Sequence, residues 1–240
     1  MEIVQSAYIL HTRPYRETSV IATFLTQEHG KLNGVVRGVR GKTRSSMQKN
    51  AILQPFQKLS IQWRDKPNSN NDLVTVRSFE SEPVRFYLEG ESSFCGLYMN
   101  ELLYRLMYPR VSVEAVFEEY QQALLNLLSA QDRAEQAWLL RKFELNLLNE
   151  LGVSLLTELD AHKQPIQSEL QYQFYPEMGA YPLLDSQTVG NGTLISGECL
   201  LKLSKLEYCE SCLGSWKRLL RHVLNGYLGS KPIMTRKLFK

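Results

Sequence analysis

The sequence predicts an α+β protein in which an N-terminal β-barrel precedes a helical region. In residues 1–80, short runs rich in β-branched and aromatic residues alternate with polar turns, as is typical of strands. After Pro83 the apolar residues recur at spacings of three and four, as is typical of helices that bury one face. A chain of 240 residues is long enough for two modest cores. We therefore expect two domains, residues 1–80 and residues 81–240.

Five strands are predicted for the first domain. The most regular alternation lies at residues 52–64, where Leu59, Ile61 and Trp63 share one face. A polar turn at residues 65–72 follows it. The predicted strands cover residues 3–10, 18–26, 31–37, 52–64 and 73–77. Five short strands, with the longest insertion between the third and the fourth, favour a closed barrel of the OB-fold type. An SH3-like barrel also fits this pattern.

The helical region is predicted from apolar spacing and from signals at helix ends. Residues 92–108 and 112–129 place large apolar side chains at helical spacing, and Pro109 follows the first run. Asp132 and Glu135 have the arrangement of a capping box that opens a third helix. We expect these three helices to share one core.

The pattern changes after Gly152, which stands where a helix C-cap is expected. Residues 153–195 contain prolines, aromatic residues and scattered glycines, and predict an irregular insertion with short strands or turns. Helical spacing returns near residue 197, and residues 216–227 contain a clear apolar stripe. The opposite face of that last helix is basic, with Lys217, Arg218 and Arg221.

Charge is distributed unevenly along the chain, although the net charge is only +3. Residues 1–80 contain 12 Lys or Arg against 6 Asp or Glu, residues 81–216 contain 9 against 19, and residues 217–240 contain 7 against none. Two basic ends on either side of an acidic middle indicate an anionic partner.

Composition excludes several classes of protein. The N-terminus lacks the basic and apolar segments of a signal peptide, and no run of apolar residues is long enough for a membrane span. Four cysteines in 240 residues are too few for a disulfide scaffold. We therefore expect a cytoplasmic protein with reduced thiols and no membrane contact.

The longest cationic stretch is residues 30–49, which contain no acidic residue. Its glycines permit close backbone approach, and Ser45 and Ser46 can donate to phosphate oxygens. We expect a cationic loop after the third strand that binds a polyanion. The alternative is a solvated loop whose charge serves solubility. The six cations are Lys31, Arg37, Arg40, Lys42, Arg44 and Lys49.

Two motifs with specific chemistry are incomplete. Residues 41–43 (GKT) resemble the end of a Walker phosphate-binding loop, but Val36 stands where that loop needs a glycine. Cys209 and Cys212 have the spacing of half a zinc site, but the chain has no second pair. We expect buried thiols, no metal and no nucleotide hydrolysis.

The sequence contains no Ser-His-Asp or Cys-His signature and no compact carboxylate cluster, so we expect a protein that is not an enzyme. One further feature is the pair Arg141 and Lys142, which adjoins the apolar face of the third helix. Such a pair could receive an acidic peptide that ends in an aromatic residue. An ordinary charged helix side explains it equally well.

Four segments resemble, in order and spacing, the RecO family of bacterial recombination mediators, in its gammaproteobacterial form. They are LHTRPYRETSVIATFLTQEHG (10–30), NELLYRL (100–106), LRKFELNLLNELG (140–152) and LGSKPIMTRKLF (228–239). Each segment alone is weak evidence for the family, but four segments in the same order and spacing are a specific signal. The resemblance implies an OB-fold followed by a helical domain, no cofactor and no catalytic turnover.

The resemblance also implies a function and partners. Members bind single- and double-stranded DNA without sequence preference and anneal complementary strands. They bind the acidic C-terminal tail of the single-stranded DNA-binding protein SSB, and with RecR they help to load RecA. Two alternatives stay open from the residues: an RNA-binding OB-fold protein and an interaction scaffold for an acidic protein.

By position, the family's DNA-contacting loop falls on Arg37, Arg40, Lys42 and Arg44, and we add Lys31 and the basic face at residues 217–221 on charge. The position that binds the SSB tail falls on Arg141, with Lys142 beside it. Many relatives have a four-cysteine zinc site after the helix that ends here at Gly152, but residues 153–182 contain no cysteine. No metal is therefore expected.

Overall fold

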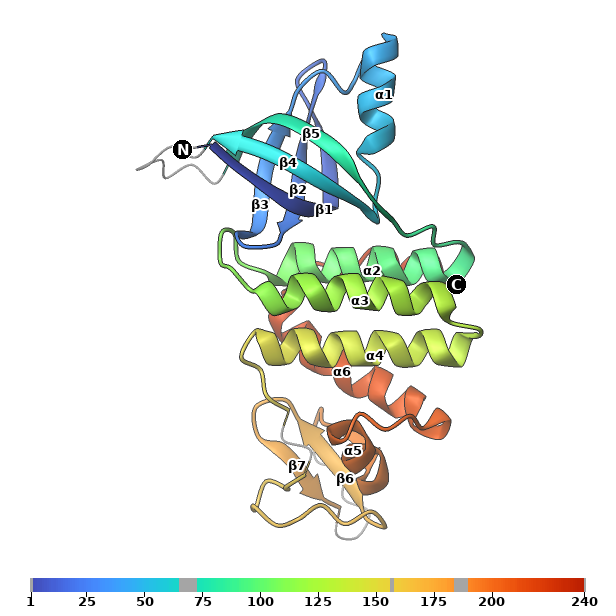
Figure 1. Ribbon diagram of the computed structural model, residues 1–240. Helices are drawn as coiled ribbons and strands as arrows, with labels where there is room; N and C mark the ends of the chain where they lie inside the picture. The colour runs from blue at the N-terminus through green and yellow to red at the C-terminus, as the bar shows by residue number, and fades with distance from the viewer. Residues whose placement is uncertain (1, 65–72, 156–157, 184–189, 240) are drawn as a thin grey trace. The chain divides into compact units, whose positions relative to one another are not determined.

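The computed structural model describes residues 2–64, 73–155, 158–183 and 190–239 (Figure 1). The chain forms two compact units. The first contains residues 1–130 together with the C-terminal residues 233–240, and the second contains residues 131–232. This division lies elsewhere than residue 80, where the sequence pattern changes from strands to helices, because the first two long helices pack with the barrel.

A closed five-stranded barrel begins the first unit. Its strands are β1 (Glu2–Tyr15), β2 (Ser19–Thr26), β3 (Gly30–Val36), β4 (Gln57–Arg64) and β5 (Leu73–Arg85). The strand order β1-β2-β3-β5-β4, with β4 returning to β1 and β3 parallel to β5, is that of an OB-fold. The predicted fold class is confirmed. The polar turn predicted at residues 65–72 lies outside the described residues.

Strand alternation explains how the barrel closes on a small core. Alternate residues of every strand point inward, among them Phe24, Leu32, Ile61 and Trp63, each at most 2% exposed. Gly34 is needed at its place in β3, because a Cβ there would lie 2.7 Å from a methyl of Val76 on the neighbouring strand β5. The residues of these strands that face outward do not pack in the barrel core, so they can contact other elements or ligands.

The cationic stretch is only partly the loop that the sequence predicts. Residues 44–52 form a helix, α1 (Arg44–Ile52), and the loop proper is confined to residues 37–43. Thr43 caps the helix by accepting a hydrogen bond from the backbone N–H of Ser46 at 3.2 Å. Helical periodicity gives no warning of α1, because Ser46 is its one buried residue and it has no apolar stripe.

Helices α2 (Gly90–Leu106) and α3 (Glu114–Ser129) complete the first unit, close to their predicted positions. Helix α2 packs against β1 and α3. The C-terminal 3-10 helix η2 (Thr235–Phe239) also packs on α2, where the Glu101 carboxylate accepts hydrogen bonds from the backbone N–H groups of Met234 and Thr235 at 2.8 Å. The end of the chain therefore belongs to the barrel unit.

Two buried tyrosines join the barrel to these helices. Tyr8 of β1 packs edge to face on Tyr120 of α3, with ring centroids 5.2 Å apart. The Tyr120 hydroxyl donates to Oδ1 of Asn100 at 2.5 Å, and the Asn100 amide donates to the carbonyl of Ile9 at 3.3 Å. Burial raises the pKa of both tyrosines well above the usual value of 10, and the neighbouring Glu82 adds to the shift at Tyr8.

This pair predicts loss of stability in alkali. A phenol whose pKa is higher in the folded than in the unfolded chain stabilises the fold fully below about pH 10, and that contribution is lost as the pH rises further. We expect the free energy of unfolding to fall above about pH 10, and to fall less steeply in Tyr8→Phe. Unfolding by urea at several alkaline pH values measures this. Parallel pH profiles for the two proteins would contradict the assignment.

The second unit combines helices with a small sheet. Helix α4 (Arg133–Glu150) begins at the predicted capping box, where the Asp132 carboxylate accepts from the backbone N–H of Glu135 at 2.8 Å, and Gly152 follows its end with a φ of +80°. The insertion forms the three-stranded sheet β7-β6-β8, followed by helices. These elements are β6 (Gln171–Tyr175), β7 (Gly179–Pro182), β8 (Thr193–Ser196), α5 (Gly197–Ser204), η1 (Glu210–Cys212) and α6 (Leu213–Leu228).

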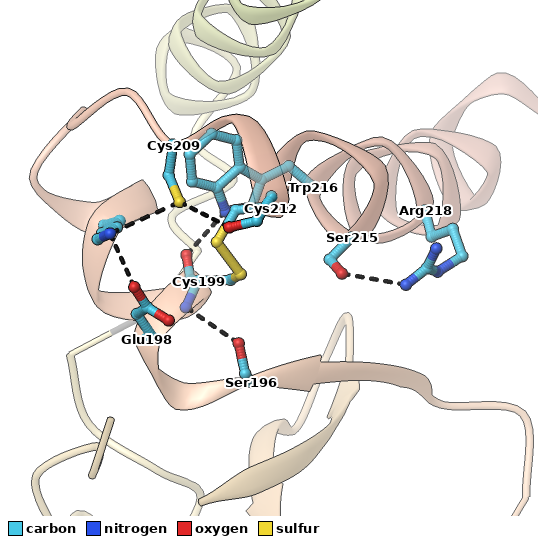
Figure 2. The surroundings of a disulfide bond; sticks show 10 residues. Ser196, Glu198, Cys199, Cys209, Cys212, Ser215, Trp216 and Arg218 are labelled. Carbon is cyan, nitrogen blue, oxygen red and sulfur yellow. Dashed lines mark hydrogen bonds and ion pairs between the residues drawn. A yellow bond between two sulfur atoms is a disulfide. The ribbon is translucent and has the colours of Figure 1, made fainter. Parts of the chain in front are cut away.

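A disulfide between Cys199 and Cys212 contradicts the expectation that the cysteines are reduced thiols (Figure 2). It joins α5 to the start of α6. Cys95 and Cys209 are the free cysteines of the described chain. The sequence pairs Cys209 with Cys212 by spacing, whereas the fold brings Cys199 to Cys212 from 13 residues away.

Candidate nucleic-acid interface

The turn between β1 and β2 and the segment that follows β3 lie together at one end of the barrel. Val20, near the start of β2, pairs with Val36 at the end of β3, so residues 16–18 and 37–40 lie at the same end. The contact is specific, because the carbonyl of Thr18 accepts hydrogen bonds from the backbone N–H groups of Val39 at 2.9 Å and of Arg40 at 3.0 Å.

Three arginines line an open depression at this end. Arg16, Arg37 and Arg40 surround a space of about 750 Å³, with the carboxylate of Glu17 also in the lining. All three arginines are solvent-exposed. Arg40 is positioned by a hydrogen bond from its Nη1 to the carbonyl of Arg16 at 3.1 Å. The arrangement places three guanidinium groups, each a multiple donor suited to phosphate, around one concavity.

Arg16 is the member of this cluster that sequence reasoning missed. It lies in the polar link between two strands, far along the chain from the cationic stretch. Its backbone adopts the left-handed conformation, with a φ of +53°, in the tight turn that brings it to Arg40. The sequence feature that could have indicated Arg16 is a basic residue in the loop between the first two predicted strands. Only strand pairing, however, brings that loop to residues 37–40.

The remaining cations of the stretch lie along α1. Lys42 and Arg44 are exposed at the start of the helix. Lys49 reaches back toward the loop, where its Nζ is 3.9 Å from the position that a Cβ on Gly38 would take. Ser46 does not offer its hydroxyl to a phosphate, because it is buried and donates to the carbonyl of Thr43 at 2.9 Å. Ser45 stays exposed.

Lys31 lies apart from this surface, contrary to our grouping of the cations by sequence. It is 8% exposed, and its Nζ donates to the carbonyl of Tyr104 at 2.7 Å. Burial lowers its pKa. Lys31 stands at the start of β3, at the opposite end of that strand from Arg37, and so we leave it out of the proposed phosphate contacts of the loop.

The basic C-terminal segment is divided between the two units. Lys217, Arg218 and Arg221 are exposed on α6 of the second unit, and the Nη2 of Arg218 donates to Oγ of Ser215 at 3.0 Å (Figure 2). The last residues, including Arg236, belong to the first unit. The apolar stripe of α6 is buried from Trp216 to Leu224, whereas Tyr227 at its end is 55% exposed.

Arg141 and Lys142 lie on α4 of the second unit. Arg141 is 6% exposed, and its Nη2 forms an ion pair with Oε1 of Glu144 at 2.8 Å. The Nε of Arg141 is buried without a hydrogen-bond partner among the described residues. Lys142 is half-buried. The exposed pair that the sequence suggests is therefore one buried, carboxylate-paired arginine and one accessible lysine.

The described part of the chain offers no cluster of three or more His, Cys, Asp or Glu side chains that is arranged to hold a metal ion. None of the described helices is long and apolar enough to cross a membrane. Exposed arginine and lysine side chains of the described surface can bind anions.

Comparison with known proteins gives a consistent answer over the whole chain. Residues 1–82 match the family model "Recombination protein O N terminal" and residues 88–237 match "Recombination protein O C terminal". The chain is 37% identical over 236 residues to a DNA repair protein RecO from Pseudomonas paraeruginosa, with 98% of this chain and 94% of that protein covered. It is 36% identical over 240 residues to the RecO of Nitrosococcus oceani, with 99% and 93% covered.

Among solved structures, an asparaginyl-tRNA synthetase from Entamoeba histolytica aligns with a TM-score of 0.28 and 14% identity, over 78% of this chain and 40% of that one. A likeness this weak says nothing of fold or function. The family models and the relatives, by contrast, extend over both units. The chain therefore belongs to the RecO family of DNA repair proteins, with a role in recombinational repair.

Proposed function

We propose that this protein binds single- and double-stranded DNA without sequence preference and anneals complementary strands, including strands coated with SSB. The observation that supports this most directly is the cluster of Arg16, Arg37 and Arg40 at one end of an OB-fold barrel. Guanidinium groups there would contact phosphates, which every sequence presents alike. Such contacts position the backbone and leave the bases free to pair.

The mechanism is neutralisation of charge on two strands. Cations that contact phosphates release condensed counterions, and they offset the repulsion between strands that slows annealing. The arginine depression and α1 offer one cationic surface, and the exposed face of α6 offers a second. Base pairing itself supplies the driving force, so no catalytic turnover by the protein is required.

The same proposal includes partners. An acidic tail of SSB would bring the protein to exposed single strands in the cytoplasm, at the nucleoid, and RecR would act with it to load RecA. The tail would bind at α4, where Lys142 is accessible and the Nε of Arg141 lacks a partner among the described residues. An anionic peptide group would satisfy that donor.

Annealing of complementary oligonucleotides coated with SSB tests the proposal. Full-length SSB is compared with SSB that lacks its acidic tail, and an RNA pair of the same sequence is included. We expect acceleration with DNA, and acceleration of SSB-coated strands only when the tail is present. No acceleration with either SSB would refute the mediator function, and a preference for RNA would favour an RNA-binding protein.

The site at α4 needs variants that do not unfold the helix. Removing Arg141 alone would leave the Glu144 carboxylate buried beside it without this ion pair, at a cost of about 3 to 5 kcal/mol. Arg141→Met combined with Glu144→Leu removes both charges, and an exchange of this kind is often neutral for stability. We expect this double variant to bind an SSB tail peptide at least about tenfold more weakly than the parent protein does. We expect the same loss of affinity for Lys142→Glu.

Lys205→Glu is the matched control, because Lys205 is an exposed lysine of the same unit outside α4. Fluorescence anisotropy of a labelled tail peptide measures the affinities. If the α4 variants bind the peptide as the parent does, or if Lys205→Glu weakens binding equally, the tail does not bind at Arg141 and Lys142.

A further inference from the structure

A second concavity of the barrel unit is separate from the arginine depression. It is a pocket of about 410 Å³ over the outer face of β1, β2 and β3, beside the end of α2. Its volume lies in the range of sites that enclose a small molecule. Six of the residues that line it are His11, Arg13, Thr23, Lys31, Asn33 and Tyr104.

The strand register places these side chains on the outside of the barrel. Phe24 and Leu32 point into the core, so the alternating residues Thr23, Lys31 and Asn33 point outward. Thr23 and Asn33 are directly paired across β2 and β3. This outer face of the second and third strands is where OB-folds commonly hold oligonucleotides.

An aromatic surface borders the pocket. The rings of His11 and Tyr104 have centroids 4.8 Å apart and are tilted by 40°. Tyr104 is 38% exposed, although it lies on a helix that buries most of its large apolar residues. Burial, together with the charge of Arg13, lowers the pKa of His11 despite the opposing effect of Glu101, so the imidazole is uncharged at neutral pH and offers a planar face.

Polar groups complete the lining. The Thr23 hydroxyl donates to Oδ1 of Asn33 at 2.7 Å, which orients the amide so that its nitrogen is available to donate elsewhere. No described residue accepts from that nitrogen. The ammonium of Lys31 is held in place by the carbonyl of Tyr104, and Arg13 is exposed. The pocket thus combines a planar aromatic surface, an amide donor and two cations.

We propose that this pocket takes one unstacked base of a single-stranded nucleic acid. Tyr104 and His11 stack on the base, Asn33 donates to an acceptor on its edge, and Arg13 contacts the neighbouring phosphate. The inference rests on the proposed function and deepens it. Because a base in a duplex is paired and stacked between neighbours, the pocket holds single strands in a way that a duplex cannot use. It gives the protein a preference for the strand that is still to be annealed.

Binding of two charge-matched ligands tests the pocket. One is a thymidine dodecamer and the other is a dodecamer of abasic deoxyribose phosphate, so that phosphates are equal and only the bases differ. Stacking on an aromatic side chain strengthens binding by about five- to a hundredfold per base. We expect the parent protein to prefer the thymidine strand within that range, and Tyr104→Leu to bind both ligands with nearly equal affinity.

The control variant is Tyr108→Leu, since Tyr108 is a 74% exposed tyrosine near the same helix and outside the pocket lining. It should keep the full preference for the thymidine strand, and Tyr104→Phe should keep it too. Tyr104→Leu should leave affinity for the abasic strand unchanged, which also shows that it is folded.

The outcomes separate this inference from the proposed function. If the parent binds the thymidine and abasic strands equally, the pocket takes no base, while phosphate binding stands. If it binds neither strand at low salt, the proposed function itself fails. A strand with 5-iodouracil gives a check that needs no variant: photocrosslinks should map to His11 or Tyr104, and crosslinks confined to peptides elsewhere would overturn the assignment.

Discussion

Replacing Arg37 and Arg40 together with alanine is expected to weaken binding to every DNA sequence by a similar factor and to flatten its salt dependence. Both arginines are exposed and line the depression with Arg16. Each lost phosphate contact on a single strand lowers the slope of log affinity against log salt by about 0.7. Two contacts lower it by about 1.4, so the loss of affinity should be about sevenfold larger at 50 mM than at 200 mM salt.

Titrations of a labelled oligonucleotide at several salt concentrations measure the slope. Arg64→Ala with Lys205→Ala is the matched control, because both residues are exposed, neither lines the depression, and the change in net charge is the same. The control should retain the parent slope. If the Arg37→Ala, Arg40→Ala variant binds DNA at low salt as tightly as the parent does, this end of the barrel is not part of the DNA interface. Arg16→Ala should add to the effect.

The largest effect on stability is expected from Trp216→Ala. Trp216 is fully buried, and the centroid of its ring lies 5.0 Å from that of Trp138 of α4. Its indole N–H donates to the carbonyl of Cys199 at 2.7 Å, beside the disulfide. Truncation leaves a large cavity and a buried carbonyl without this donor. We expect the second unit to lose about 3 to 5 kcal/mol of stability.

Hydrogen exchange followed by mass spectrometry measures this effect unit by unit. Peptides of α4 and α6 should lose protection, and peptides of the barrel should keep theirs, because the barrel belongs to the other compact unit. Trp216→Phe keeps an aromatic ring but not the N–H, so it should lose less, about 1 to 3 kcal/mol. Equal loss of protection in the barrel would show that the two units unfold together.

Helix α1 and the strands on either side of it differ in how far they could be predicted from the sequence. The strands were predictable because alternate residues of a barrel wall face the core, and from Lys58 to Arg64 polar and apolar residues of β4 alternate in step with burial. Helix α1 was not predictable from periodicity, because its side chains are almost all solvated. Its one local signal is the N-cap at Thr43, a residue that in the sequence also resembles the end of an incomplete phosphate-binding loop.

The candidate sites divide in the same way. Arg37 and Arg40 could be selected from sequence because charge density is a local property of the chain. Arg16 could not, because the pairing of β2 with β3 decides that the first loop meets residue 40. Lys31 and Arg141 were selected by charge, yet burial by surrounding chain gives each a fixed partner, the carbonyl of Tyr104 and the carboxylate of Glu144.

The sequence by itself therefore determined the fold class, the order of the long elements and the cationic character of the barrel end, since periodicity and charge are read from near neighbours. The tertiary structure alone decided which cations share a concavity, which are buried, and which cysteines meet. Each of these depends on contacts between residues far apart in the chain. The pocket beside Tyr104 is of that kind, because it joins residues of β1, β2, β3 and β5 to α2, and Lys31 and Tyr104 in it are 73 residues apart in the chain.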